Sequence, residues 1–352
     1  MDIKALLKRM SETAGVSGYE TAVAEIVSTC PWADDTRTDP LGSLILTKRG
    51  TRNTDGTRPK VMLAAHMDEI GLIVSAVEKG GFLRFDTIGG FDQRVLLAQE
   101  VVVHGRKVLP GIIGAKPPHI QKPDERKKAV PLDELFIDVG FESAEAVQEF
   151  VQVGDLITLR AGSTELQGSM LSGKAMDDRA SVAVMFECLK VLQSMTHTAD
   201  VYATATVQEE TGYRGAITST FGIMPDVGIA IDVGHGDMPG VPESDSIKVG
   251  GGPGIGLGPH VHPKLHERFV KTARDWNIPY SIEPSPYPGG TDAFAIQVTQ
   301  MGIPTILLSL PLRYMHTPVE TLDYEDVQRT GRLIAIFISE LESEFVEGLR
   351  CF

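Results

Sequence analysis

Residues 60–65 read KVMLAA, a run that is apolar after its first residue. A strand that is apolar without alternation is covered on both faces, as in a parallel sheet between layers of helices. Further short apolar runs occur at 44–46, 201–207, 227–231 and 305–310, and helical patterns occur at 179–195, 262–276 and 324–344. This alternation predicts an α/β fold with a mainly parallel sheet sandwiched by helices.

Two more helices are expected near the N-terminus. Residues 1–15 have an amphipathic pattern with charges throughout. Ser17 and Glu20 have the spacing of a capping box, which predicts a helix from there to about Cys30.

The pattern changes between residues 70 and 159. Short apolar runs alternate there with glycines, at 72–77, 82–88, 101–104, 108–113, 136–139 and 156–159. One helix signal interrupts them, with Ser143 as the N-cap of residues 144–151. Such short, closely spaced strands are typical of a small β-barrel or sandwich. We therefore expect an α/β domain made of residues 1–69 plus 163–352, interrupted by an inserted β-barrel-like domain over residues 70–162.

The composition excludes several classes of partner. The chain carries 33 Lys and Arg against 47 Asp and Glu, a net charge of −14, whereas nucleic-acid binders need basic surfaces. No apolar run approaches the roughly 20 residues of a membrane span, and the N-terminus lacks the apolar region of a signal peptide. The cysteines, Cys30, Cys188 and Cys351, are far apart and odd in number, which favours a reducing cytoplasm over a disulfide framework.

Four apolar runs lead into residues that commonly bind metals. They read AAHMDE at 64–69, VQEETG at 207–212, IAIDVG at 229–234 and LSLPLRYMHTPVE at 308–320. A fifth cluster, SGKAMDDRAS at 172–181, precedes a predicted helix. Sites in open α/β sheets lie at the carboxyl edge of the strands, and acidic residues are seldom buried unless paired or metal-bound. The pattern predicts a metal site at this edge.

The residue types narrow the choice of metal. Imidazole and carboxylate ligands without cysteine suit Zn²⁺, Co²⁺ or Mn²⁺. His66 and Asp68 share a strand face, so the carboxylate could fix the tautomer of a ligand imidazole. The alternative for these two residues alone is a surface pair.

Glu209 and Glu210 stand side by side where a strand ends in a turn. Adjacent strand residues point to opposite faces, so the simplest interpretation of the pair is a frayed strand end with both carboxylates in solvent.

Other signals have simpler interpretations. Asp178 is expected to contact Arg179 or to cap the following helix. His260, His262 and His266 cluster near a helix start, where a terminal or surface role is favoured over a further metal.

Taken in order, the motifs HMDEIG, GKAMDDR, VQEETGYRGA, AIDVG, YPGGTDA and SLPLRYMHTPVE closely resemble those of the tetrahedral aminopeptidases. These are di-metal peptidases, also known as glutamyl or deblocking aminopeptidases, and some members carry an endoglucanase label. The resemblance spans residues 66–320, including the insert. It implies a zinc-exopeptidase-like fold for the α/β domain, and two divalent metals per chain, Zn²⁺ or Co²⁺ with Mn²⁺ as a third choice.

The resemblance also implies the metal ligands. His66 and Asp232 match the ligands of one metal, and Glu210 and His316 match those of the other. Asp177 matches the carboxylate that bridges both.

Two further roles follow from the same resemblance. Asp68 matches the residue that orients His66, and Glu209 matches the general base. Where the strand opens into a turn its alternation breaks, so both glutamates can enter one cavity. Glu210 would then hold a metal while Glu209 stays free to accept a proton.

The expected function is removal of N-terminal residues from peptides, by a cytoplasmic homo-oligomer of twelve subunits built from dimers into a tetrahedron. Thr291 and Asp292 are candidates for substrate binding, because the family's matching loop lies by the substrate. The insert would serve in assembly and at the substrate entrance. Two alternatives stay open at this stage: a glycosidase, which uses two carboxylates and normally no metal pair, and a non-enzymatic, metal-stabilised assembly protein.

Overall fold

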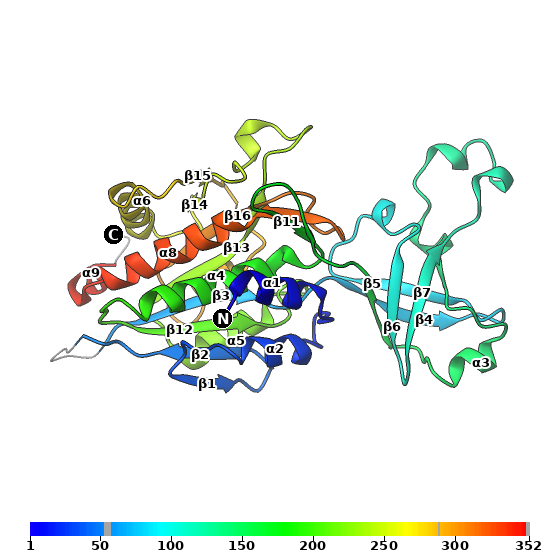
Figure 1. Ribbon diagram of the computed structural model, residues 1–352, viewed down its shortest axis with the longest axis horizontal. Coiled ribbons are helices and arrows are strands. Elements are labelled where there is room, and N and C mark those ends of the chain that lie inside the picture. The colour runs from blue at the N-terminus through cyan, green and yellow to red at the C-terminus, as the bar shows by residue number, and fades with distance from the viewer. Residues whose placement is uncertain (53–57, 288, 350–352) are drawn as a thin grey trace.

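The computed structural model describes residues 1–52, 58–287 and 289–349, so Cys351 lies outside the described residues. It shows a layered α/β unit with a smaller β-barrel projecting from one end (Figure 1). The predicted fold class, a parallel-rich sheet between helices with an inserted barrel, is confirmed.

The sheet of the α/β unit has eight strands. In spatial order they are β1 (Asp35–Thr38), β2 (Leu44–Lys48), β12 (Asp200–Thr206), β3 (Lys60–His66), β13 (Val227–His235), β16 (Thr305–Leu312), β14 (Gly254–Leu257) and β15 (Ser281–Pro284). The central strands β12, β3, β13 and β16 are mutually parallel. β2 and β14 run antiparallel to them on either side. The central strands are almost wholly buried, as their apolar sequences predict.

Helices cover both faces of this sheet. Their bounds are α1 (Ile3–Glu12), α2 (Thr21–Val27), α4 (Met176–Leu192), α5 (Arg214–Ile223), α6 (Pro263–Asp275), α7 (Asp292–Gln297), α8 (Tyr324–Ser339) and α9 (Ser343–Glu347). α4 packs between α1 and α8 and against β3 and β13. α5 and α7 pack against each other and against β12 and β13. One continuous apolar core joins these layers.

The barrel is closed by six antiparallel strands. In order around the barrel they are β4 (Gly71–Val77), β5 (Leu83–Ile88), β8 (Phe136–Asp138), β7 (Val108–Gly114), β6 (Glu100–His104) and β9 (Leu156–Leu159). It has its own apolar core. β4 and β9 are paired neighbours, with Leu72 opposite Ile157. The chain therefore enters and leaves the barrel at one place.

The remaining elements are short. A small sheet contains β10 (Thr164–Glu165), β11 (Met170–Gly173) and β17 (Glu320–Asp323). The 3₁₀ turns are η1 (Gln93–Val95), η2 (Pro118–Ile120), η3 (Glu125–Lys127), η4 (Leu132–Glu134) and η5 (Glu243–Asp245). Ser143 caps α3 (Ala144–Gln148) as predicted, although this helix is shorter than 144–151. Among the described residues, none of the helices has the length and apolar character needed to cross a membrane.

Three local predictions were wrong. Ser17 and Glu20 form no capping box: α2 begins at Thr21 without a side-chain cap, and both side chains contact other segments. Asp232 lies within β13 and not after it, because that strand continues to His235. The last long helix ends at Ser339, and a separate short helix follows.

Candidate metal centre

Four predicted ligand residues and the predicted base, Glu209, meet at one edge of the sheet. Because the four central strands are parallel, their carboxyl ends lie together. β3 ends in His66, β12 is followed by Glu209 and Glu210, β13 carries Asp232, and β16 leads to His316. All five side chains line a single cavity of about 370 Å³.

Asp177 occupies the middle of this group. Its Oδ1 lies 3.1 Å from Nε2 of His66, and its Oδ2 lies 3.4 Å from Nε2 of His316. The same His316 nitrogen is 3.3 Å from Oε1 of Glu210. One carboxylate therefore faces an imidazole on each side, which is the arrangement expected of a bridging ligand.

Two groups of side chains have the spacing of a metal site. Within each group the donor atoms lie within 4.8 Å of one another: His66, Asp177 and Glu210 in one, and His66, Asp178 and Asp232 in the other. Burial raises the pKa of Asp232 well above its usual range, and the charge of Asp177 adds to the effect. Asp178 Oδ1 is buried and finds no hydrogen-bond partner among the described residues. The carboxylates outnumber the two imidazoles beside them, so further positive charge would stabilise the cluster and the residues fit divalent cations.

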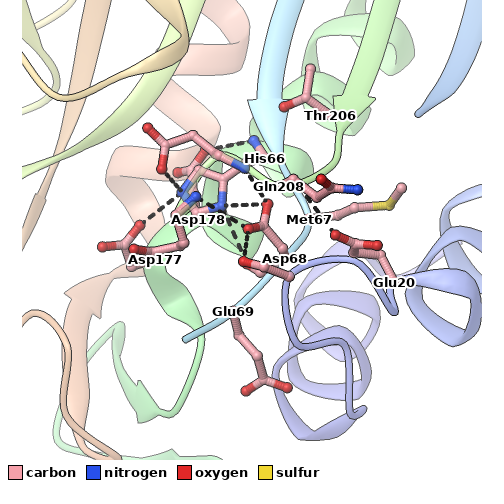
Figure 2. Close-up of polar contacts among 12 residues, drawn as sticks. Glu20, His66, Met67, Asp68, Glu69, Asp177, Asp178, Thr206 and Gln208 are labelled. Atoms are coloured by element: carbon pink, nitrogen blue, oxygen red, sulfur yellow. Dashed lines mark hydrogen bonds and ion pairs between the residues drawn. The ribbon is translucent and has the colours of Figure 1, made fainter. Parts of the chain in front are cut away.

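Asp68 organises the backbone around the site and is fully buried. Its Oδ1 accepts the amide of Glu209 at 3.0 Å, and its Oδ2 accepts the amide of Glu210 at 3.2 Å and the hydroxyl of Ser17 at 2.5 Å. Nδ1 of His66 is 3.2 Å from the Asp68 carbonyl oxygen and 3.5 Å from its Oδ1 (Figure 2). Asp68 is thus placed to orient His66, and it also fixes both glutamates.

The turn after β12 explains why two adjacent carboxylates enter one cavity. Gln208 adopts a left-handed backbone with φ of 56°, which ends the alternation of the strand. Its amide donates to Oε1 of Glu20 at 3.2 Å. Glu209 and Glu210 then both face the cavity, so a solvated, frayed strand end does not describe this pair.

Glu209 stands apart from the ligand groups. Its Oε2 is 3.9 Å from Nε2 of His66, and its buried Oε1 has no hydrogen-bond partner in the described part of the chain. Burial raises the pKa of Glu209 to about 10; the positive charge of His66 opposes this and the negative charge of Asp232 adds to it. The geometry leaves this carboxylate free to receive a proton.

Glu320 is a site residue that the sequence reasoning missed. It is buried at the start of β17, where Oε1 accepts the amide of His316 at 2.8 Å and Oε2 accepts the amide of Asp177 at 3.1 Å. It therefore holds two predicted ligands by their backbones. The one sequence signal was an acidic residue four positions after His316.

A buried ion cluster supports the site from behind. Lys174 Nζ lies 2.6 Å from Oε2 of Glu69, and Arg179 Nη2 lies 3.3 Å from Oε1. Arg179 also donates to the carbonyl of Met10 in α1. The cluster ties the end of β3 to the start of α4 and to the N-terminal helix.

The two substrate-binding candidates are placed differently. Thr291 lines the cavity, and its hydroxyl accepts the amide of Ala293 at the start of α7. Asp292 is buried beside β12, where its Oδ2 accepts the hydroxyl of Thr206 at 2.5 Å. Thr291 can contact a substrate in the cavity, whereas Asp292 lies beneath it.

The interpretation of Asp178 was wrong, because its Oδ2 accepts the amide of His66 at 3.2 Å and α4 has no side-chain cap. His262 occupies the N-cap position of α6, as a helix-terminal role requires. The expectation for His260 was wrong, because this residue is buried and lines the cavity and has neither a helix-terminal nor a surface position.

Comparisons with known proteins agree with one another. A family model described as M42 glutamyl aminopeptidase matches residues 42–333. The chain is 36% identical over 345 residues to the lysyl aminopeptidase of Pyrococcus furiosus, covering 96% of this chain and 97% of that protein.

Two solved structures are similar over nearly the whole chain. The TET aminopeptidase of Thaumarchaeota archaeon SCGC AB-539-E09 is 36% identical with a TM-score of 0.93, covering 99% of this chain and 100% of that chain. The Pyrococcus horikoshii TET1 peptidase, which can assemble into a tetrahedron or a large octahedral shell, is 32% identical with a TM-score of 0.84, covering 97% of this chain and 100% of that chain.

Proposed function

Because the chain belongs to the M42 glutamyl aminopeptidase family, we propose that it removes N-terminal residues from peptides at a centre that holds two divalent cations. The family assignment confirms the resemblance seen in the sequence motifs, and the chain is an aminopeptidase. The number of cations, their identity and the residue roles are our proposals. Zn²⁺ or Co²⁺ suits the donors best, with Mn²⁺ as a third choice.

The position of Asp177 between two imidazoles carries this proposal. We assign His66 and Asp232 to one cation, Glu210 and His316 to the other, and Asp177 to both. Two cations there would polarise the substrate carbonyl and make the attacking water more acidic. Asp68 and Glu320 would keep the ligands in place through the hydrogen bonds described above.

Glu209 is the proposed general base. It would accept a proton from the attacking water as the water oxygen bonds to the carbonyl carbon. It would then return that proton to the leaving amine as the peptide C–N bond breaks. Nearby cations would lower the pKa of Glu209 from the raised value set by burial, since opposite charge favours the ionised form.

We also propose that the chain forms a homo-oligomer, twelve subunits in a tetrahedron of dimers. This is supported by one similar solved structure that is described as a dodecamer and by the TET1 peptidase, which can assemble into a tetrahedron or a large octahedral shell. Exposed apolar side chains support a subunit contact on the α/β unit. Ile217 and Phe221 of α5 lie with Leu41 and Val298 along an open groove of about 710 Å³. A second copy of the chain would cover this surface, so Phe221→Asp should give smaller species by light scattering, with Glu25→Gln on α2 as a surface control.

We keep the proposed boundary between an α/β catalytic domain, residues 1–69 plus 163–352, and an inserted domain, residues 70–162. The closed barrel with its own core supports it. A cytoplasmic location is also proposed, and the buried, unpaired thiols of Cys30 and Cys188 are compatible with it.

The alternatives fit the geometry less well. A glycosidase needs two carboxylates flanking a sugar bond, without a cluster of imidazoles between further acids. A purely structural metal site is closed by its ligands, whereas Glu209 faces the same cavity and has a free oxygen. Both features favour hydrolysis of peptides.

Metal removal tests the proposal. Chelation should abolish the release of N-terminal residues, and Zn²⁺ or Co²⁺ should restore it; activity that survives full removal of metal would refute the centre. His316→Ala should bind about one metal equivalent per chain less, while Asp177→Ala should weaken both, because a shared ligand couples two ions. Asp177→Ala protein that still binds two full metal equivalents per chain would contradict the bridging role of Asp177.

A further inference from the structure

The cavity beside the proposed metal centre has a second wall that the reaction does not use. This wall comes from β13, β15 and β16 and includes His235, Glu283 and Ser309. The cavity lining, in the described part of the chain, contains no lysine and no arginine. Any charged group that recognises a substrate side chain here is therefore acidic or an imidazole.

Glu283 is the distinctive residue of this wall. It projects from β15, and its Oε2 is buried without a hydrogen-bond partner among the residues that the structure describes. Glycines leave room for its carboxylate: a Cβ at Gly234 would lie 3.1 Å from Oε1, and a Cβ at Gly254 would lie 3.0 Å from Oε2. Two glycines, on the strands β13 and β14 that flank β16, thus form a slot that holds a carboxylate.

A buried carboxylate oxygen without a partner is unfavourable. Burial raises the pKa of Glu283, although the hydroxyl of Ser309 and the charge of His235 oppose this. His260, on the same cavity, has a pKa lowered by burial, so it stays neutral near pH 7 and does not repel a cation. Apart from the His235 imidazole, no described side chain of this wall brings positive charge to Glu283, so an incoming molecule would supply the partner of the carboxylate.

We propose that this wall binds the side chain of the substrate's N-terminal residue and that Glu283 selects lysine or arginine there. The proposal rests on the proposed function, because it takes the adjacent centre as the place where the peptide bond is cut. An ammonium or guanidinium group would pair with the carboxylate of Glu283, which lines the cavity. An acidic side chain would meet like charge, and an apolar one would leave the carboxylate unpaired.

A panel of aminoacyl chromogenic substrates tests this, with the metal-loaded protein acting on lysyl, arginyl, leucyl and glutamyl derivatives. We expect the highest kcat/KM for the two basic residues. In Glu283→Gln, kcat/KM for the lysyl substrate should fall about 30-fold or more, because one partner of a buried charge pair is lost. The leucyl value should stay near that of the wild type. A wild-type preference for leucyl or glutamyl substrates would overturn the proposal, as would an unchanged lysyl preference in Glu283→Gln.

The controls separate selectivity from folding and from chemistry. Glu243→Gln removes an exposed carboxylate outside the cavity and should leave the preference unchanged. Inhibition of the wild type by free lysine and by norleucine needs no variant: lysine should inhibit at lower concentration, and equal inhibition would contradict a cation site. If no aminoacyl substrate is cleaved after metal addition, the proposed function fails, whereas hydrolysis without preference for basic residues overturns this inference alone.

Discussion

The α/β unit and the barrel differ in what they bury. The α/β unit encloses many ionisable side chains, including the acidic residues of the proposed centre and the cluster of Glu69, Lys174 and Arg179. Between Gly71 and Leu159, the hydroxyl-bearing Thr158 is the one polar or charged side chain that is buried among the described residues. The two parts are joined at one place and lie side by side (Figure 1).

This difference indicates that the buried ionisable residues of the α/β unit serve the proposed reaction or support its site, whereas the buried residues of the barrel stabilise its fold. Desolvating a charge costs several kcal/mol unless partners offset it, so a unit that needs only to fold uses an apolar core. The barrel does this with one cluster of aliphatic and aromatic side chains. Changes to the buried charges of the α/β unit should therefore alter chemistry or stability, and changes in the barrel should alter assembly.

Removing the barrel is the largest test of this division. Replacing residues 71–159 by a short linker is feasible because β4 and β9 are paired neighbours. We expect a small species by light scattering, since the proposed subunit contacts of the barrel are lost. Peptide hydrolysis should also be poor, because the barrel side touches the site: a Cβ at Gly90 would lie 3.3 Å from Nδ1 of His316. A shortened chain that still forms the large assembly would contradict the role given to the barrel.

Glu209 and Glu210 provide the sharpest test within the α/β unit. Glu209→Gln keeps the shape of the side chain but cannot accept a proton, so kcat should fall about 10²–10⁴-fold. Metal analysis should still find two equivalents per chain. Glu210→Gln should instead lose metal affinity, because a neutral amide is a poorer ligand for a divalent cation.

Each of these neighbours is the control for the other. Wild-type kcat in Glu209→Gln, or metal loss equal to that in Glu210→Gln, would show that the two roles are assigned wrongly.

Glu69→Gln tests the buried charges that lie outside the proposed ligand set. The substitution leaves Lys174 and Arg179 buried without their counter-charge, and we expect a loss of about 3–5 kcal/mol in the free energy of unfolding. Urea denaturation at fixed protein concentration measures it. Glu165→Gln removes the exposed partner of Lys4 and Lys8 and should change little.

The effect of Glu69→Gln on the free energy of unfolding should depend on pH. Burial alone would raise the pKa of Glu69, but Lys174 and Arg179 outweigh it and the pKa lies below its ordinary value of 4.5. A carboxylate with a lowered pKa in the folded state stabilises that state at pH values above its pKa in the unfolded chain. This stabilisation is lost as the pH falls through the pKa of the folded state. The difference between wild type and Glu69→Gln should therefore shrink below about pH 4.5. An equal difference at pH 7 and in acid would contradict the charge pairing.

Local sequence patterns predicted the secondary structure and the place of the site well. Continuous apolar runs gave the central strands, and the shift to short strands gave the barrel. The predicted ligand residues meet at the sheet edge because parallel strands align their carboxyl ends. Their roles as ligands stay a prediction.

Contacts between distant segments could not be predicted. Ser17 and Glu20 have the spacing of a local capping box, yet their side chains form hydrogen bonds with distant residues. The Ser17 hydroxyl donates to Asp68, and Glu20 accepts the backbone amide of Gln208. Glu320 on β17 contacts the backbone of His316, and Glu283 on β15 lines the cavity. The order of strands in the sheets sets these positions, and that order cannot be read from local sequence. Asp178 was misassigned because the backbone at the start of α4 is not helical at this residue, and its carboxylate accepts the His66 amide. Tertiary contacts decided each of these cases.

The smallest expected effect comes from removing one buried hydroxyl in each part. Ser17→Ala removes the hydroxyl that donates a hydrogen bond to the Asp68 carboxylate. This carboxylate still accepts hydrogen bonds from the backbone amides of Glu209 and Glu210. A hydrogen bond to a charged group contributes about 1.5–3 kcal/mol, and with two donors left we expect kcat to fall roughly three- to tenfold. Thr158→Val removes the hydroxyl that contacts His104 in the barrel at 2.9 Å and should leave kcat unchanged. Because Ser17 acts through the position of Glu209, its variant should keep its metal content and its KM. An equal fall in kcat in Thr158→Val and Ser17→Ala would contradict the comparison. It would show that a buried hydroxyl of the barrel matters for catalysis as much as one beside the proposed metal centre.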